Sequence, residues 1–242
     1  MENQTKKSTT KDYETEIERW AQEDVLQLAN HFHRLNNNNQ FERTSNFIMS
    51  EDDVKTFQAI NGSIKDLRIY LALKEQNKEE HTFFPVLRVT NNEDEHTFLE
   101  LRDANEIRIQ NSTKAELVPE LFKNIICKNW DSIDVNLIDD LFTARKIEDT
   151  EFEVTVRVKY FQICKEIIDV IKGINIINGI TLYSGIDMNK FSDKYQISFT
   201  PVLGFQHEEQ NTDDLTFGLK NIMELSKGEI FVEYTSPCPP TC

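Results

Sequence analysis

The sequence predicts an α+β fold in which one unit, two helices followed by an antiparallel meander, occurs twice in tandem about a pseudo-twofold axis. In the first half, apolar residues recur at helical spacing until Leu67, where the pattern changes to short segments rich in Ile, Val, Phe and Tyr. The second half repeats this change of period. The segment F-x-P-V-L also occurs twice, at residues 83–87 and 199–203, and together these observations indicate a duplicated unit.

Local signals predict each element of the first half. A helix is predicted over residues 12–35, because an aspartate can cap its start and the asparagine run that follows competes with the helical backbone. Ser50 and Asp53 form a start signal for a second, shorter helix that ends at the Asn-Gly-Ser of residues 61–63. The strands of the meander are predicted at residues 67–73, 81–89, 96–102 and 106–110.

The second half shows the same kinds of signal. A helix is predicted from about Val118, and a further helix follows Asp131. Residues 151–160 alternate between apolar and polar side chains, which is typical of a strand with one face in water. A helix over residues 164–172 precedes a second meander, whose strands are predicted at residues 179–186, 195–205, 215–219 and 229–234.

The spacing between matched residues tests the repeat, because a true duplication keeps one order and a nearly constant offset. Tyr70 and Tyr183 are 113 positions apart, and Pro85 and Pro201 are 116 positions apart. The other matches are Trp20 with Ile133, Val25 with Ile138, Leu28 with Leu141, Phe47 with Phe161 and Phe98 with Phe217. A chance similarity between two α+β segments is the alternative. The predicted units are a disordered N-terminal tail (residues 1–11), a first repeat (residues 12–125), a second repeat (residues 126–235) and a Pro/Cys-rich C-terminal tail (residues 236–242).

The two matched prolines need a physical explanation, since both lie in segments that otherwise resemble strands. Proline lacks the backbone N–H that a sheet ladder uses, so it is tolerated on an edge strand or at a β-bulge. Pro85 and Pro201 are therefore predicted to lie at such positions, where they also discourage pairing with other chains. The two halves are expected to join their sheets or to bury their helices between them.

Composition limits the classes of partner. The chain has 27 Lys and Arg against 42 Asp and Glu, a formal net charge of −15. Its average surface therefore repels a phosphate backbone, and nucleic acid is not an expected partner. Every apolar run falls short of the roughly 20 residues that span a bilayer, so no membrane partner is expected. The N-terminal residues lack the apolar stretch of a signal peptide, and a cytoplasmic protein is predicted.

Candidate thiol and metal chemistry is limited to a few residues. Cys238 and Cys242 flank a stiff, proline-containing segment, and two thiolates at this spacing can supply half of a zinc site, form a disulfide or accompany a docking peptide. A mobile terminus with two incidental thiols is the alternative. His81 and His96 open neighbouring strands and can approach each other across the sheet, although solvated turn positions are the favoured explanation. No cofactor is expected apart from zinc at the C-terminal cysteines.

The first meander holds a group of arginines, namely Arg68, Arg88, Arg102 and Arg108. Such a group can bind a small charged ligand, or it can pair with the surplus carboxylates of the chain. The sequence lacks a glycine-rich phosphate loop, a G-x-S-x-G nucleophile motif and an H-E-x-x-H metal motif. No catalytic residues are therefore predicted.

Several short motifs carry a resemblance to a known group. The chain has F-x-x-S at residues 47–50, L-R-I-Y at residues 67–70 and a final Cys-Pro-Pro-Thr-Cys. In these motifs it resembles an uncharacterised group of bacterial proteins with an I-R-I-Y strand motif and a C-terminal Cys-Pro-Pro-x-Cys tail. The resemblance covers the chain in pieces, and it implies no catalytic residues.

These observations favour a non-enzymatic binding or assembly protein that acts through protein–protein contacts, with another protein or with a second copy of itself. One alternative is a metal- or thiol-dependent protein that uses the C-terminal cysteines. Another is a protein that sequesters a small charged ligand between its two halves.

Overall fold

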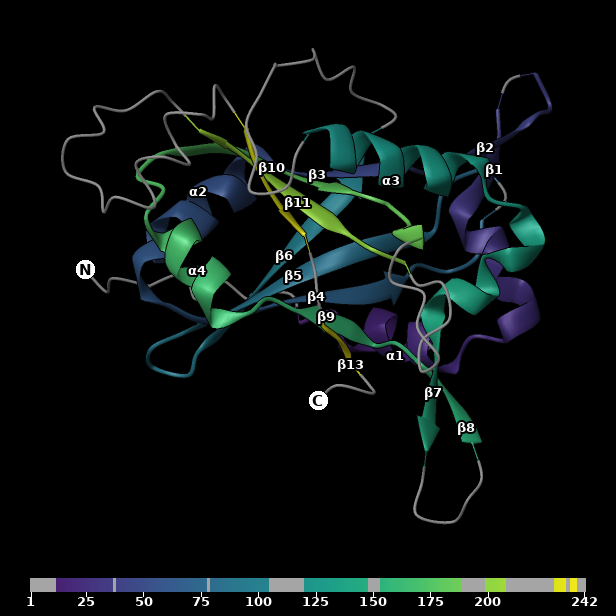
Figure 1. Ribbon diagram of the computed structural model, residues 1–242, viewed down its shortest axis with the longest axis horizontal. Helices are drawn as coiled ribbons and strands as arrows, with labels where there is room; N and C mark the ends of the chain where they lie inside the picture. The colour runs from purple at the N-terminus through teal and green to yellow at the C-terminus, as the bar shows by residue number, and fades with distance from the viewer. Residues whose placement is uncertain are drawn as a thin grey trace, which may run out of the picture.

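The computed structural model of the chain describes residues 12–36, 38–77, 79–104, 120–147, 153–188, 199–207, 229–233 and 236–238. It shows an α+β fold, as predicted (Figure 1). The helices are α1 (Glu14–Gln22), α2 (Glu51–Ile60), α3 (Glu120–Ser132) and α4 (Lys165–Lys172), and the 3-10 segments are η1 (Val25–Phe32), η2 (Asn61–Ser63), η4 (Val135–Leu137) and η5 (Asp139–Phe142). The strands are β1 (His33–Leu35), β2 (Phe41–Arg43), β3 (Asn46–Met49), β4 (Ile64–Leu73), β5 (Phe83–Asn91), β6 (His96–Asp103), β7 (Thr143–Ile147), β8 (Glu153–Arg157), β9 (Tyr160–Gln162), β10 (Ile177–Tyr183), β11 (Val202–His207), β12 (Glu229–Glu233) and β13 (Ser236–Cys238).

Nine strands form one antiparallel sheet, in the order β12-β11-β10-β3-β6-β5-β4-β9-β13. β12 and β13 stand at opposite ends of this order, yet only residues 234 and 235 separate them in the sequence. The Cα atoms of Glu233 and Ser236 are thus at most about 11 Å apart, so the sheet closes on itself. The hairpins β1–β2 and β7–β8 stand outside this sheet (Figure 1).

The two halves of the chain present the same order of elements and exchange one short strand each. In each half a helix, 3-10 structure, a hairpin, a short strand and a second helix precede the strands of a meander. β3 of the first half pairs with β10 of the second, and β9 of the second half pairs with β4 of the first. Because each short strand extends the sheet of the other half, the two halves share one sheet.

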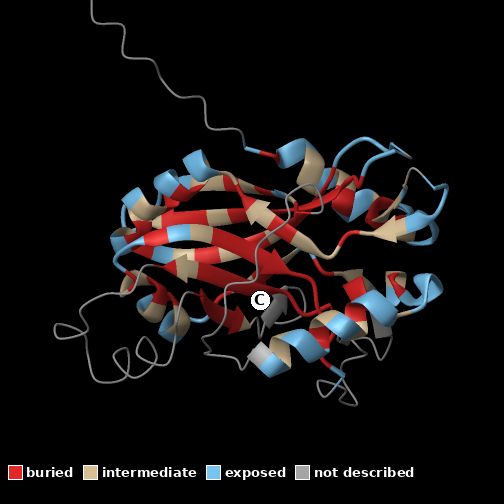
Figure 2. Cartoon of the chain, turned by 90° about the horizontal axis from the view of Figure 1, so that it is seen from above, coloured by how far each residue is buried: buried red, intermediate tan, exposed pale blue. Residues whose placement is uncertain are grey.

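The apolar core lies inside the closed sheet and extends to the 3-10 segments. Figure 2 shows buried residues concentrated on the strands, whereas exposed residues lie mainly on helices and loops. Where the two halves meet, the rings of Phe32 and Phe142 stack with 5.2 Å between their centroids and 12° between their planes. Aromatic pairs of this kind stabilise a core beyond the area they bury, so this pair helps to fix how the halves meet.

Two tryptophans tie each half to the other. The indole N–H of Trp20, which lies on α1, donates to the carbonyl oxygen of Val158 at 2.7 Å. The indole N–H of Trp130, which lies on α3, donates to the carbonyl oxygen of Thr44 at 2.8 Å. Both donors are thereby satisfied inside the core, where an unpaired N–H is costly.

Helices α1 and α3 cover the outer faces of different parts of the sheet. The contacts of the α1 segment are with β4 and β5, in a cluster of Tyr13, Ile17, Ala72, Phe84 and Val86. The contacts of α3 are with β10, β11 and β12, in a cluster of Phe122, Ile126, Tyr183, Val202 and Phe231. α1 and α3 therefore lie outside the joined sheets and are not buried between them. Among the described residues, none of the helices is long and apolar enough to cross a membrane.

The helix predicted over residues 12–35 is wrong in its extent. α1 ends at Gln22, and Asp24 then adopts an extended conformation in which its side chain accepts a hydrogen bond from the N–H of Leu26. This cap starts the 3-10 segment η1, and β1 follows it. The further helix predicted after Asp131 is likewise replaced by η4 and η5. An aspartate side chain that bonds the backbone two residues on competes with continuous helix at both places.

The strand predicted over residues 151–160 divides into β8 and β9. Val158 donates its N–H to the carbonyl oxygen of Phe142 at 2.8 Å, and its own carbonyl oxygen accepts from Trp20. The chain therefore leaves the β7–β8 hairpin at this residue and joins the closed sheet. The apolar alternation continues through the break, so the sequence pattern alone does not reveal it.

Most other predicted elements are confirmed. Ser50 accepts a hydrogen bond from the N–H of Asp53 and caps α2 as predicted. The predicted helix over residues 164–172 is α4, and the predicted strands are confirmed as β4, β5, β6, β10 and β12. The strand predicted at residues 195–205 is confirmed only in its last part, as β11, because residues 195–198 lie outside the described residues and β11 begins at Val202. The predictions at residues 1–11, 106–110 and 215–219 lie outside the described residues.

The edge-strand prediction for Pro85 is wrong, because β5 is an interior strand between β4 and β6. Leu71, opposite Pro85, donates its N–H to the carbonyl oxygen of Lys159 on its other side. The proline nitrogen therefore faces β6. β6 pairs with β5 only as far as Glu100, and its next residue pairs with β3. Pro85 thus lies where β6 leaves β5, so no backbone N–H is needed there for a hydrogen bond between the strands.

The same change of partner occurs at the C-terminal end of the sheet. β12 pairs with β11 as far as Glu233, and β13 then pairs with β9. Pro201 immediately precedes the β11 residue opposite Glu233, so it also lies where a neighbouring strand departs. Residues 236–238, predicted as part of a tail, therefore form a strand, and Cys242 lies outside the described residues.

The strand registers refine the residue matches predicted from the sequence. Tyr70 lies opposite Val86, and Tyr183 lies opposite Val202, so these markers occupy corresponding places. Trp130, instead of Ile133, makes the cross-half hydrogen bond that corresponds to that of Trp20.

Two further features of the predicted repeat differ from the structure. Phe98 lies opposite Arg88, and the residue in the corresponding place is Phe231, opposite Gly204. The predicted match, Phe217, lies outside the described residues. The boundary predicted between residues 125 and 126 falls inside α3.

Candidate functional site

The structure brings together two of the four arginines that the sequence singled out. Arg68 on β4 and Arg88 on β5 lie directly opposite each other. Arg102 on β6 is 62% exposed and lies 3.8 Å from Glu100, away from this pair. Arg108 lies outside the described residues.

Strand alternation places these two arginines on the outer face of the sheet. Ile69 and Leu71, which flank the outward positions of β4, belong to the core, so Arg68 and Tyr70 point outward. On the other side of β4, the short strand β9 places Tyr160 opposite Tyr70. We call the surface formed by Arg68, Tyr70, Arg88 and Tyr160 the arginine–tyrosine face.

Asp66 holds the two guanidinium groups in place. Its Oδ2 lies 2.8 Å from Nε of Arg68 and 3.4 Å from Nη2 of Arg88. Its Oδ1 accepts a hydrogen bond from Nε2 of Gln162 at 3.0 Å. Among the described residues, the ion pairs of both arginines go to this one carboxylate. The face therefore carries two positive charges against one negative charge.

Each guanidinium also lies over an aromatic ring. Arg68 is 4.8 Å from the ring centroid of Tyr160, and Arg88 is 5.1 Å from that of Tyr70. The two tyrosine rings are 4.9 Å apart and 37° from parallel. These cation–π contacts restrict the long side chains, so the donors are held ready before any partner binds.

The arginine–tyrosine face remains partly open to solvent. The side chains of Arg68 and Arg88 are 25% and 16% exposed, and both tyrosines are half-buried. Nε of Arg88 is buried and has no hydrogen-bond acceptor among the described residues. The parts of the two guanidinium groups that a partner can reach are the exposed ones.

The corresponding surface of the second half has different chemistry and is covered. The strand positions that match Arg68 and Arg88 hold Thr181 and Gly204, which lie opposite each other on β10 and β11. Helix α3 covers this surface, and Nζ of Lys123 lies 4.5 Å from the ring centroid of Tyr183. The first half is therefore the one that presents cations and open aromatic rings.

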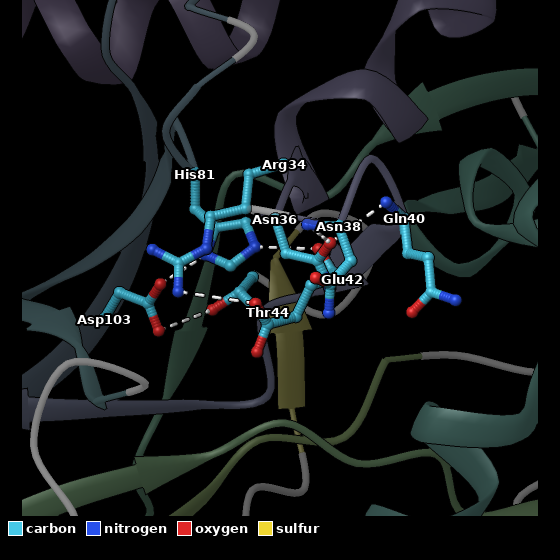
Figure 3. Close-up of polar contacts among 8 residues, drawn as sticks. All are labelled: Arg34, Asn36, Asn38, Gln40, Glu42, Thr44, His81 and Asp103. Atoms are coloured by element: carbon cyan, nitrogen blue, oxygen red, sulfur yellow. Dashed lines mark hydrogen bonds and ion pairs between the residues drawn. The ribbon is translucent and has the colours of Figure 1, made fainter.

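His81 lies in a buried polar cluster at the end of the β1–β2 hairpin (Figure 3). Its Nδ1 contacts a carboxylate oxygen of Asp103, and its Nε2 lies 2.9 Å from the carbonyl oxygen of Glu42. The hydroxyl of Thr44 donates to the same aspartate at 3.3 Å. The solvated turn position favoured for His81 is wrong, because this residue is buried, whereas His96 is exposed as expected. The alternative, an approach of the two histidines, is not found either, since His96 contacts the hydroxyl of Thr90 on β5.

This cluster acts as a structural clamp. The two ring nitrogens of His81 face the Asp103 carboxylate and the Glu42 carbonyl oxygen, and the imidazole side chain is 1% exposed. The clamp connects the segment before β5 to β2 and to the end of β6. It thereby fixes the hairpin against the sheet.

His31 extends the buried polar region toward η1. Its Nδ1 contacts the hydroxyl of Thr82 at 2.7 Å, and its Nε2 lies 3.2 Å from Oε2 of Glu23. Burial lowers the pKa of His31, and the nearby Glu23 carboxylate acts in the opposite direction. Burial thus favours the neutral form of the ring.

Of the predicted thiol site, the structure describes only the backbone of Cys238, and Cys242 lies outside the described residues. Cys238 contributes its backbone to β13. Cys127 is half-buried on α3, where burial raises the pKa of its thiol to about 12, and such a thiol is unreactive. Cys164 is exposed at the start of α4. Within the described ranges, no group of three or more His, Cys, Asp or Glu side chains is arranged to hold a metal ion.

The sequence did not indicate Tyr160, which belongs to the arginine–tyrosine face, or Asp66 and Gln162, which hold the face in place. Tyr160 and Gln162 lie on β9 of the other half. Their proximity to Arg68 depends on a strand pairing between distant parts of the chain. Comparison with known proteins gives no match to a family model, a curated protein or a solved structure.

Proposed function

We propose that this chain is a non-enzymatic binding protein whose recognition surface is the arginine–tyrosine face, and that its partner is a protein with an acidic segment. The observation that carries the proposal is the direct cross-strand pairing of Arg68 with Arg88. Like charges opposite each other destabilise a sheet. The matching pair in the second half, Thr181 and Gly204, is uncharged, so the fold itself does not need two arginines there.

The composition of the face favours a protein partner. Tyrosine and arginine are the residue types most enriched, with tryptophan, among the residues that dominate protein–protein binding energy. Sites for small molecules are usually concave, whereas this face is the outer surface of a sheet. The rings of Tyr70 and Tyr160 supply contact area with little side-chain entropy to lose on binding.

The charge of the face favours carboxylates on the partner. Two guanidinium groups share the single carboxylate of Asp66, so one positive charge is left without a fixed counter-charge among the described residues. The guanidinium fork matches the geometry of a carboxylate. The overall charge of −15 repels an acidic partner at long range, so attraction is confined to the few ångströms around the face.

We further propose that the chain arose by tandem duplication about a pseudo-twofold axis, and that binding developed in one copy. Reciprocal contacts support this proposal. Arg43 lies 5.6 Å from the ring centroid of Trp130, and Arg157 lies 5.7 Å from that of Trp20. An experimental structure tests the proposal: a rotation of about half a turn should superpose the two halves, and the absence of any such rotation would contradict it.

The binding proposal is tested with short synthetic peptides that differ in their number of Asp and Glu residues. Affinity for the full chain is expected to rise with carboxylate number. Arg88→Gln is expected to weaken binding about thirtyfold, which corresponds to the ~2 kcal/mol of a dominant interface residue. Arg102→Gln is the matched control, because Arg102 lies on the adjacent strand and contacts Glu100 instead of Asp66. Binding that is independent of peptide charge, or equal losses in the two variants, would refute the proposal.

A further inference from the structure

A cleft of about 540 Å³ lies at the hairpin end of the first half, away from the arginine–tyrosine face. It is formed by η1, by the β1–β2 hairpin and by the segment that follows β4. This volume falls within the range of small-molecule sites in proteins. Four of its lining residues are side-chain amides, Gln27, Asn30, Gln76 and Asn77.

The lining of the cleft is uncharged, although the chain as a whole is rich in charge. Besides the amides, the lining residues are His33, Leu35 and Phe41. Nδ1 of His33 lies 2.8 Å from the carbonyl oxygen of Ala29, and its Nε2 accepts a hydrogen bond from Nε of Arg43 at 3.0 Å. The ring is therefore the neutral tautomer with its proton on Nδ1. Burial also lowers the pKa of His33. An ionic ligand gains no charge pair from these residues.

The amides offer donors and acceptors together. Nδ2 of Asn30 donates to Oε1 of Gln27 at 2.9 Å, which orients this pair on η1. Oδ1 of Asn77 accepts from the N–H of Glu79 at 3.0 Å, which leaves the Nδ2 group of Asn77 as its donor side. A hydroxyl group both donates and accepts a hydrogen bond, so amides in this mixture suit a ligand with several hydroxyls.

An aromatic ring stands at the edge of the cleft. Phe41 is 75% exposed, and its strand partner Leu35 is also exposed. Folding leaves this apolar surface in water, so a ligand that covers the ring gains hydrophobic stabilisation. A pyranose ring has an apolar C–H face for such contact and hydroxyls around its rim for the amides.

We propose that this cleft is a binding site for a neutral saccharide, with Phe41 stacking on the sugar ring and the amides binding its hydroxyls. The site is separate from the arginine–tyrosine face and does not depend on the function proposed for it. No bond is made or broken in this binding step.

Saturation-transfer NMR on the full chain tests the site, with the neutral trisaccharides maltotriose, cellotriose and N,N′,N″-triacetylchitotriose as probes. Transfer to the ring protons of at least one trisaccharide is expected for the wild-type chain. Phe41→Ala is expected to reduce this transfer at least about tenfold, as loss of a dominant contact does. Phe41 is largely exposed, so this variant is expected to keep the melting temperature of the wild-type chain.

Leu26→Ala is the matched control. Leu26 is an apolar residue of η1 that is 80% exposed and does not line the cleft. Its replacement should leave the saturation transfer unchanged. Absence of transfer to all three trisaccharides overturns the proposal, and so does equal transfer in the wild-type chain and in Phe41→Ala.

Discussion

Arg68 and Arg88 face each other across β4 and β5, and Asp66 makes this arrangement compatible with folding. All three side chains are less than a third exposed, so their charges are only partly screened by water. The sequence indicated the two arginines as a possible ligand site. It could not indicate Asp66, because the chain has 42 Asp and Glu residues and most acidic positions are equivalent in sequence.

Replacing Asp66 by asparagine is expected to destabilise the protein. The change leaves two partly buried guanidinium groups opposite each other without a carboxylate, at a cost of about 2 kcal/mol. Urea unfolding at neutral pH measures this as a lower midpoint with an unchanged slope. Adding Arg88→Gln to the variant should restore part of the loss. An unchanged midpoint for Asp66→Asn would show that the ion pairs contribute nothing to stability.

His31 is expected to make stability depend on pH. Burial lowers its pKa in the folded state, so between the folded and unfolded values the unfolded chain binds more protons. The stabilising effect is complete above the unfolded pKa of about 6.5 and is lost as pH falls through the lower folded value. Replacing His31 by leucine should flatten the fall in unfolding free energy toward acid pH, as measured by urea unfolding. Parallel pH profiles for variant and wild type would contradict this expectation.

At the scale of elements, the position of α3 explains why the two outer faces differ. α3 starts at Glu120, and Phe122 and Lys123 in its first turn cover Tyr183 and Phe231. In the first half, α1 begins at Glu14, because Tyr13 before it adopts a left-handed conformation (φ 56°) that does not extend the helix toward the N-terminus. The shorter helix leaves the arginine–tyrosine face partly open.

Gly185 allows α3 to approach the sheet closely. A Cβ at this position would lie 2.7 Å from Cδ1 of Ile126 and 2.9 Å from the carbonyl oxygen of Thr200. Gly185→Ala is therefore expected to lower the unfolding free energy by about 1–3 kcal/mol. Gly62→Ala is the control, since a Cβ there meets no atom within 4 Å. Thermal unfolding of both variants provides the comparison, and equal melting temperatures would show that α3 does not depend on this close approach.

The elements that the sequence predicted well are those with a long and uniform pattern. β4 and β5 span ten and nine residues that are rich in Ile, Leu, Val, Phe and Tyr, and α2 carries its own cap. β3 and β9 span four and three residues, which is too short for a period to be read. The exchange of these two strands, and with it the place of Tyr160 beside Arg68, therefore could not be predicted. The break at Asp24 was missed because apolar spacing continues into η1.

At the scale of the whole molecule, the exchanged strands make the two halves depend on each other. β4 gains its second neighbour only when β9 of the second half is folded, and β10 gains its second neighbour only when β3 of the first half is folded. The buried indole groups of Trp20 and Trp130 also lose their acceptors when the halves are separated. Folding is therefore expected to be cooperative across the chain.

Separate production of residues 1–118 and 119–242 tests this dependence. Neither fragment is expected to show a cooperative thermal transition by circular dichroism, because each exposes core that the other half covers. The full chain is expected to unfold in one transition with the same midpoint by fluorescence and by circular dichroism. A fragment that melts cooperatively by itself would show that the halves are independent domains.

The most direct measurement of the proposed function is a chemical-shift map of the full chain titrated with a glutamate-rich peptide. If the peptide binds the arginine–tyrosine face, the largest chemical-shift changes are expected at Arg68, Tyr70, Arg88 and Tyr160. These changes are expected to disappear in Arg88→Gln. Changes centred on Thr181 and Gly204, or an even spread over the molecule, would contradict the proposed function.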